Sequence, residues 1–385
     1  MSSDLYFVAA EASGDQLGRE VIDAVRSERS GLAIAGIGGG AMAGAGIVSP
    51  IDTSPLSIIG FIEGIKAYST VTRLADEAAD AIVQAKPRAV VLIDSWGFML
   101  RVAQRLRKRA PEIHLIKLIG PQVWATRPGR TKTLAATVDH LLCIHDFEAP
   151  YYAPFGLRTT VIGPPALARL EQGDGKAFRS VHGMGDDQDM VLVLPGSRRS
   201  EIAGVAPALM DAARALKSEK PNRAIVVAPA GSVAEAFGAA FPDAADWTLR
   251  ADGGSARRDA MAAATLVLAC SGTVTTEVAI QSAPMIVGYR TGWLTWAIAR
   301  GILYQRKHIT LLNIASDDTE VVPEFVQTHL KADLIAETAS KMLADPSALT
   351  SAVEAQNAAL KRMGLGGPPA YSVAAEAILK DLDGL

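Results

Sequence analysis

The chain has 385 residues, of which 49% are hydrophobic and 21% charged, and its formal net charge is −3. This length favours two domains, and the slightly acidic balance excludes the strong basic excess of a typical nucleic-acid-binding protein. Cys143 and Cys270 lie in or beside apolar runs, which predicts buried thiols in a reducing compartment. The stretch 285–303 is interrupted by Arg290 and Arg300 and does not predict a transmembrane span. With no charged-then-apolar signal segment at the start, we expect a cytoplasmic protein.

The first half of the chain alternates short apolar runs with amphipathic stretches. Near-continuous Val/Ile/Leu/Ala runs separated by helices are typical of a parallel sheet covered on both faces. The expected strands of this half are Leu5–Ala9, Ala33–Ile37, Ala89–Ile93, His114–Ile119, His140–Ile144 and Thr160–Ile162.

A polar segment separates this half from a second series of the same kind. After Gly163-Pro164-Pro165, residues 171–189 are rich in Gly and Asp, and we interpret them as a linker between residues 1–170 and residues 190–350. The expected strands of the second series are Val191–Leu194, Ala224–Ala228, Trp247–Leu249, Leu266–Ala269 and Met285–Val287. From Pro323 onward we expect only helices, ending with residues 351–385. The order predicts an α/β protein of two doubly wound domains with a cleft between them.

Two expected strands of the second domain each run into a turn of small residues and then a helix. Pro195-Gly196-Ser197-Arg198 follows the first of them, and Ser271-Gly272-Thr273 with Glu277 follows another. Free amides and the helix dipole favour an anion at such a junction, and Arg198 adds a planar guanidinium that can donate two hydrogen bonds to a diphosphate. Glu277, one turn into its helix, is placed to accept hydrogen bonds from a ribose. The pair predicts a nucleotide-diphosphate site, although either turn alone is equally explained by ordinary helix capping.

Two further turns of the first domain carry candidate functional residues. Asp94 ends an apolar strand and is followed by Ser95-Trp96-Gly97-Phe98, which makes it a candidate general base or, alternatively, the N-cap of the next helix. The turn Glu11-Ala12-Ser13-Gly14-Asp15 is expected to hold a polar substrate at the same sheet edge, or to cap its own helix. The run 36–40 is Gly-rich, and we interpret it as a turn that permits close approach of backbone or ligand. No metal-ligand cluster and no cofactor motif is evident.

An apolar stripe follows Asp52-Thr53-Ser54-Pro55. Ile58, Phe61, Ile62 and Ile65 are spaced as on one face of a helix, a pattern that usually packs into a core. Because the stripe lies in a βα loop with Lys66 and Arg73 nearby, we interpret it as an exposed surface for acyl chains and a membrane.

Several of these motifs, in this order, resemble those of the lipid-A-disaccharide synthase family, and the resemblance extends by motif over residues 5–315. The segments that carry it are Ala10-Glu11-Ala12-Ser13-Gly14-Asp15, Gly60-Phe61-Ile62-Glu63, Ile93-Asp94, Gly120-Pro121-Gln122-Val123-Trp124-Ala125-Thr126, Leu194–Arg198, Ser271–Glu277, Val287-Gly288-Tyr289-Arg290 and Leu311-Leu312-Asn313. The sequence departs from the family pattern at Ala10, Gly120, Thr126 and Leu312.

The resemblance implies a GT-B glycosyltransferase fold, in which the C-terminal helices of residues 351–385 cross back to the first domain. It also implies an inverting transfer of 2,3-diacylglucosamine from UDP-2,3-diacylglucosamine, and the residues indicate no metal. The acceptor is the 6-hydroxyl of 2,3-diacylglucosamine 1-phosphate, and the products are a β-1,6-linked disaccharide 1-phosphate and UDP. It further implies a peripheral location on the inner face of the inner membrane, in contact with its lipids, and it leaves open whether the chain pairs with a second copy.

The resemblance also assigns roles to the site residues, with Asp94 as the catalytic base. The expected UDP-sugar residues are Ser197, Arg198, Ser271, Gly272, Thr273, Glu277 and Asn313, and the expected acceptor or cleft residues are Glu11, Ser13, Gly14, Asp15, Glu63, Gln122, Trp124 and Arg127. Two alternatives remain: a UDP-N-acetylglucosamine 2-epimerase-like enzyme, which would need no acyl-binding stripe, and a non-catalytic sugar-nucleotide-binding module, which would not need Asp94.

Overall fold

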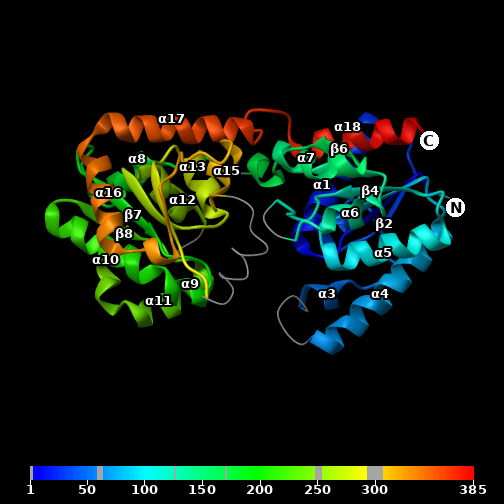
Figure 1. The fold of residues 1–385 in the computed structure, drawn as a ribbon, viewed down its shortest axis with the longest axis horizontal. Coiled ribbons are helices and arrows are strands. Elements are labelled where there is room, and N and C mark those ends of the chain that lie inside the picture. Colours follow the sequence, from blue (N-terminus) through cyan, green and yellow to red (C-terminus); the bar gives the residue numbers. More distant parts are fainter. Residues whose placement is uncertain (1–2, 59–63, 125–126, 170, 248–253, 293–306) are drawn as a thin grey trace. The chain divides into compact units, whose positions relative to one another are not determined.

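The structure is a computed structural model of the whole chain. It describes all residues except 1–2, 59–63, 125–126, 170, 248–253 and 293–306 (Figure 1), and it does not describe the side chains of residues 57–58, 64–67 and 254. The chain divides into two compact units: unit 1 comprises residues 1–168 and 366–385, and unit 2 comprises residues 169–365.

Unit 1 is built on a six-stranded parallel sheet with the order β2-β1-β3-β4-β5-β6. Its strands are β1 Leu5–Val8, β2 Ile34–Ile37, β3 Ala89–Ile93, β4 His114–Leu118, β5 His140–Cys143 and β6 Arg158–Val161. Its helices are α1 Ala12–Glu28, α2 Gly40–Gly44, α3 Ser54–Ile58, α4 Gly64–Ala85, α5 Trp96–Arg109, α6 Arg130–Ala135, α7 Ala149–Tyr152 and α18 Ala370–Asp383. Because all strands are parallel, their carboxyl ends form one edge of the sheet.

Side chains alternate across this sheet and fill a core on each face. Val90, Leu92 and Leu115 join the helices α4 and α5 on one face, while Val91 and Ile116 join α1 and α18 on the other. Nearly every strand residue of β3 and β4 is buried, which explains the continuous apolar runs in the sequence.

Unit 2 is built on a five-stranded parallel sheet with the order β11-β10-β9-β7-β8. Its strands are β7 Met190–Leu194, β8 Ala224–Val227, β9 Leu266–Cys270, β10 Met285–Tyr289 and β11 Glu324–Val326. Its helices are α8 Gly175–Val181, α9 Arg199–Gly204, α10 Ala206–Glu219, α11 Ala234–Ala240, α12 Gly254–Ala263, α13 Val274–Ile280, α15 Leu311–Ala315, α16 Ala332–Ala344 and α17 Pro346–Arg362. Helices α10 and α16 pack together over a core formed with alternate residues of the strands (Figure 1). The predicted α/β class with two parallel sheets is confirmed.

Three expectations about elements of unit 2 are corrected. Residues 171–189 are not only a linker, because they contain α8, which packs on α12 so closely that a Cβ on Gly175 would clash with the carbonyl oxygen of Ala262. Trp247 ends a 3₁₀ helix, Pro242–Trp247, rather than beginning a strand, and residues 248–249 lie outside the described residues. The region after Pro323 is not purely helical, because β11 pairs with β10.

The C-terminal residues return to unit 1. Helix α17 belongs to unit 2 and contacts α13 and α15, whereas α18 belongs to unit 1 and packs on α1. Gly364 and Gly366, with φ values of 104° and 84°, form the turn between these two helices.

Candidate functional site

The turn after β3 has an unusual backbone. Asp94 and Ser95 have φ values of 47° and 39°, a left-handed conformation that residues other than Gly rarely adopt and that concentrates at functional sites. The Asp94 amide donates to the carbonyl of Leu118, at 2.8 Å. Helix α5 takes Ser95, not Asp94, as its N-cap. The capping alternative for Asp94 is therefore excluded.

A buried lysine lies beneath this turn. Lys117, on β4, is 2% exposed and donates to the main-chain carbonyl of Asp94, at 2.5 Å. Burial lowers the pKa of Lys117 to about 7, while the negative charge of Asp94 acts in the opposite direction. The sequence prediction missed Lys117, although a lysine in the middle of the apolar run Leu115–Ile119 was a visible signal.

The turn after β1 lies next to the Asp94 turn. Strands β1 and β3 are neighbours in the sheet, and the Ser95 hydroxyl donates to Glu11 Oε1, at 3.1 Å. Ser13 is exposed and Gly14 is buried beside Ile93. The turns that carry Glu11 and Asp94 therefore lie side by side at the carboxyl edge of the unit 1 sheet.

Asp15 organises the glycine-rich turn after β2. Its carboxylate accepts from the amides of Gly39 (2.7 Å), Ala41 (2.8 Å) and Met42 (3.2 Å). A Cβ on Gly38 or Gly39 would lie 2.8 Å from an oxygen of this carboxylate, so the glycines permit the close approach. Asp15 is buried and uses its oxygens inside unit 1, which corrects its expected direct contact with a substrate.

The turns after β4 and β5 contribute aromatic groups at the same sheet edge. The Trp124 ring is buried and meets Phe147 edge-on at 5.3 Å, and Phe147 stacks on His145 at 4.8 Å. Gln122 and Arg127 are exposed. Glu63, Phe61 and Ile62 lie outside the described residues, and Ile58 and Ile65 are placed only as backbone, in α3 and α4.

In unit 2 the turns after β7 and β9 lie side by side. The two strands pair directly, with Leu194 opposite Ala269, so both turns begin at the same sheet edge. Burial raises the pKa of the Cys270 thiol to about 12, and the charge of Arg198 in the neighbouring turn opposes that shift. Ser197 and Thr273 are exposed, and Ser271 and Glu277 are half-buried. The two turns therefore begin at neighbouring positions of one sheet edge.

Glu201 changes the interpretation of the first of these turns. Its buried carboxylate accepts from the amides of Ser197 (2.8 Å) and Arg198 (3.2 Å), so these amides are not free for a phosphate. It also pairs with the Arg198 guanidinium, at 3.0 Å, whose side chain is nevertheless 69% exposed. The turn can therefore offer a phosphate the Arg198 side chain, but not the two amides.

Asn313 has a structural role. It is fully buried, its Nδ2 donates to Val322 O (2.8 Å) and Glu324 Oε1 (2.9 Å), and its Oδ1 accepts from the amides of Val321 and Val322. These four bonds use the entire hydrogen-bonding capacity of the Asn313 side chain. This corrects the expected contact of Asn313 with the UDP-sugar.

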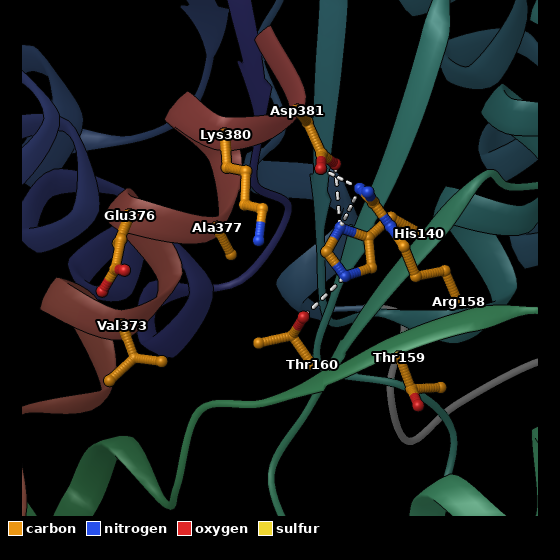
Figure 2. Close-up of a pocket in the computed structure, with 9 residues that line it drawn as sticks. All are labelled: His140, Arg158, Thr159, Thr160, Val373, Glu376, Ala377, Lys380 and Asp381. Carbon is orange, nitrogen blue, oxygen red and sulfur yellow. Dashed lines mark hydrogen bonds and ion pairs between the residues drawn. The ribbon is translucent and has the colours of Figure 1, made fainter. Parts of the chain in front are cut away.

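A pocket of about 310 Å³ lies at the opposite, amino edge of the unit 1 sheet (Figure 2). Asp381 on α18 there accepts from His140 Nδ1 at 2.8 Å, His114 Nε2 at 3.0 Å and the Arg158 guanidinium. Burial lowers the pKa of His140 to about 4. This cluster attaches α18 to β4, β5 and β6. Its place at the amino edge separates it from the Asp94 turn.

The described residues contain no group of three or more His, Cys, Asp or Glu side chains arranged to hold a metal ion. No helix among them combines the length and apolar character needed to cross a membrane.

Solved structures place this fold in a class. A UDP-GlcNAc 2-epimerase from Neisseria meningitidis bound to UDP-GlcNAc matches with a TM-score of 0.60 at 12% identity, covering 99% of this chain and all of that one. A glycosyltransferase from Rickettsia africae matches with a TM-score of 0.56 at 10% identity, covering 100% of this chain and 98% of that one. At these identities the likeness shows the fold alone, which is the GT-B glycosyltransferase-like fold.

Sequence comparison narrows the class to one family. The family model for lipid-A-disaccharide synthetase matches residues 5–370. The lipid-A-disaccharide synthase of Rhodospirillum centenum is 34% identical over 97% of this chain and 94% of its own length, and that of Rickettsia prowazekii is 31% identical over 98% of each. The chain belongs to the lipid-A-disaccharide synthase family and is a glycosyltransferase.

Proposed function

We propose that this chain transfers 2,3-diacylglucosamine from UDP-2,3-diacylglucosamine to the 6-hydroxyl of 2,3-diacylglucosamine 1-phosphate. The observation that carries the assignment of the base is the Asp94 turn: a carboxylate residue in left-handed conformation, not used as a helix cap, at the carboxyl edge of a parallel sheet. Membership of the family supplies the substrate class.

The proposed chemistry is a single inverting displacement. Asp94 takes the proton of the acceptor hydroxyl as its oxygen bonds to C1 of the donor sugar, while the bond from C1 to the diphosphate oxygen breaks and UDP leaves with that electron pair. The exposed guanidinium of Arg198 stabilises the negative charge that develops on the diphosphate. Ser271, Gly272 and Thr273 contribute to the same diphosphate site, together with the exposed side chain of Ser197, whose amide is bound by Glu201.

Glu277 and the turns of unit 1 bind the ribose of the donor and the acceptor, respectively. Glu277, in the first turn of α13, holds the ribose hydroxyls. Glu11, Ser13, Gln122, Trp124 and Arg127 receive the acceptor, and Glu63 belongs to the same set by its motif. Asp15 and Gly14 shape the turn that carries Glu11.

We further propose a peripheral location on the inner face of the inner membrane. The stripe Ile58, Phe61, Ile62 and Ile65 supplies the apolar contact. The start of α4 adds an aromatic group, because Tyr68 is 59% exposed and the Arg101 guanidinium lies over its ring at 5.1 Å. Aromatic and basic side chains together are typical of membrane interfaces. Arg73, in contrast, pairs with Glu77 at 2.6 Å.

One assay tests the proposal. The purified protein is incubated with the UDP-diacylglucosamine donor and the monosaccharide 1-phosphate, and the products are separated by mass. We expect a disaccharide 1-phosphate and UDP, at a rate that EDTA does not change. Conversion of UDP-N-acetylglucosamine to its 2-epimer, without disaccharide formation, would support the epimerase alternative instead.

A further inference from the structure

The ammonium group of Lys117 is enclosed by main chain at the carboxyl ends of β3 and β4. Lys117 stands opposite Leu92 in the register of these strands. Its Nζ donates to three carbonyl oxygens, those of Asp94 (2.5 Å), Leu92 (3.3 Å) and Leu118 (3.3 Å). All three acceptors are main-chain oxygens, so each of these hydrogen bonds goes to the backbone.

This position is an unfavourable one for a lysine. Its neighbours on this face of the sheet, Leu92 and Leu115, belong to an apolar core, and a buried charge without a contacting carboxylate costs free energy. The group also lies near the start of α5, where the positive end of the helix dipole disfavours a cation. An apolar side chain would suit the core better, so packing does not account for the lysine.

Lys117 instead completes the anchoring of Asp94. The Asp94 amide is bound by the Leu118 carbonyl, and the Asp94 carbonyl is bound by Lys117. Both main-chain polar groups of the residue are therefore held by β4. Two consecutive residues with positive φ are strained and persist only when their surroundings fix them. With the backbone fixed on both sides, the Cα–Cβ bond of Asp94, from which its carboxylate extends, has a fixed direction.

We propose that Lys117 is a positioning residue that holds the Asp94 turn in its left-handed conformation and so orients the carboxylate for proton transfer. The proposal rests on the proposed function of Asp94 as the base. Its competitor is a structural role in which Lys117 supports the fold of unit 1 and has no selective effect on the chemical step.

Two substitutions of Lys117 separate these roles. Lys117→Met keeps an unbranched chain but removes all three donors, and Lys117→Gln keeps a neutral donor on a shorter chain. We expect Lys117→Met to lower kcat by about 10- to 100-fold, as expected when a reacting group is misplaced by about 1 Å. We expect the KM values and the Kd for UDP to stay within about twofold, and Lys117→Gln to recover part of kcat.

The matched control is Leu115→Met. Leu115 is fully buried on the same strand and the same face as Lys117, but it has no polar contact with the turn. We expect its kcat to match that of the unmodified protein. A Lys117→Met variant with unchanged kcat overturns the proposal. The proposal is also overturned if Lys117→Met lowers kcat, raises KM and lowers the melting temperature together and Lys117→Gln recovers none of these losses. That result is the one expected of a purely structural role.

A second readout does not depend on activity. Amide hydrogen exchange at Asp94 should accelerate by about tenfold or more in Lys117→Met and stay unchanged in Leu115→Met, because the anchored turn opens more often. Unchanged exchange at Asp94 overturns the anchoring. Absence of disaccharide from the unmodified protein refutes the proposed function, and the exchange measurement then still decides whether Lys117 holds the turn.

Discussion

Asp94 combines a strained backbone with a place at the sheet edge where ligands of doubly wound folds bind. If it is the general base, Asp94→Asn keeps the shape of the side chain and removes its basicity. We expect kcat to fall by about 10²–10⁴, while the Kd for UDP, measured by calorimetry, stays unchanged. Near-normal turnover in this variant would show that Asp94 is not the base.

Substitutions of Arg198 and Glu277 should affect nucleotide binding differently, because Arg198 is assigned to the diphosphate and Glu277 to the ribose. Arg198→Ala should weaken UDP by about tenfold or more but uridine much less, since a charge-assisted pair with phosphate is lost. Glu277→Ala should weaken both ligands. The control is Arg199→Ala, the exposed neighbouring arginine at the start of α9. If all three variants bind UDP as tightly as the unmodified protein, both assignments are wrong.

The residues that the sequence revealed and those that it hid differ in a physical way. Asp94 and Glu11 follow apolar strands directly, so the parallel topology alone brings them to one edge. The role of Glu201 was hidden, because its carboxylate folds back onto the turn that precedes it and the sequence does not show this contact. Asn313 matched a family motif, but its buried hydrogen bonds became evident only when β11 placed Glu324 beside it.

At the scale of elements, helix α18 depends on one buried carboxylate. Asp381 accepts from His114 at the start of β4. It also accepts from His140 and Arg158, at the starts of β5 and β6 (Figure 2). Asp381→Asn removes the anionic acceptor that these donors share, and a buried donor that loses its hydrogen-bond partner costs about 1–3 kcal/mol. We expect the free energy of unfolding to fall by about 2 kcal/mol, measured by urea denaturation.

Asp383→Asn is the matched control for this prediction. It lies two residues further along the same helix, in an exposed pair with Arg29, and exposed pairs contribute little to stability. Equal destabilisation by the two substitutions would mean that the Asp381 cluster does not hold α18 in place.

The elements that the sequence failed to predict are the short and half-exposed ones. Strand β11 has three residues, all half-buried, and its apolar pattern is too brief to be distinguished from a loop. Helix α8 lies in a polar segment, and its place in unit 2 comes from glycines that allow contact with α12, a tertiary effect. The central strands were predicted to within a residue or two, because full burial on both faces makes them continuously apolar.

At the scale of the whole molecule, the chain visits unit 1, then unit 2, and returns to unit 1 with α18. The membrane prediction also belongs to this scale, because it concerns association of the whole protein with a lipid surface. Replacing both Ile58 and Phe61 with Ser should reduce binding to vesicles containing anionic lipid and raise the apparent KM for the lipid substrates. The melting temperature should not change, because the stripe is expected to face solvent rather than the core.

The salt dependence of vesicle binding provides a second measurement in the same experiment. Apolar burial persists at high salt, whereas attraction between basic side chains and anionic lipid is screened, so added salt should weaken vesicle binding only in part. Val48→Ser is the matched control, since Val48 is 89% exposed in unit 1 and lies outside the stripe; it should leave vesicle binding unchanged. A double variant that melts several degrees lower and still binds vesicles as before would show that the stripe packs in the core, which is the more usual place for an apolar face at helical spacing.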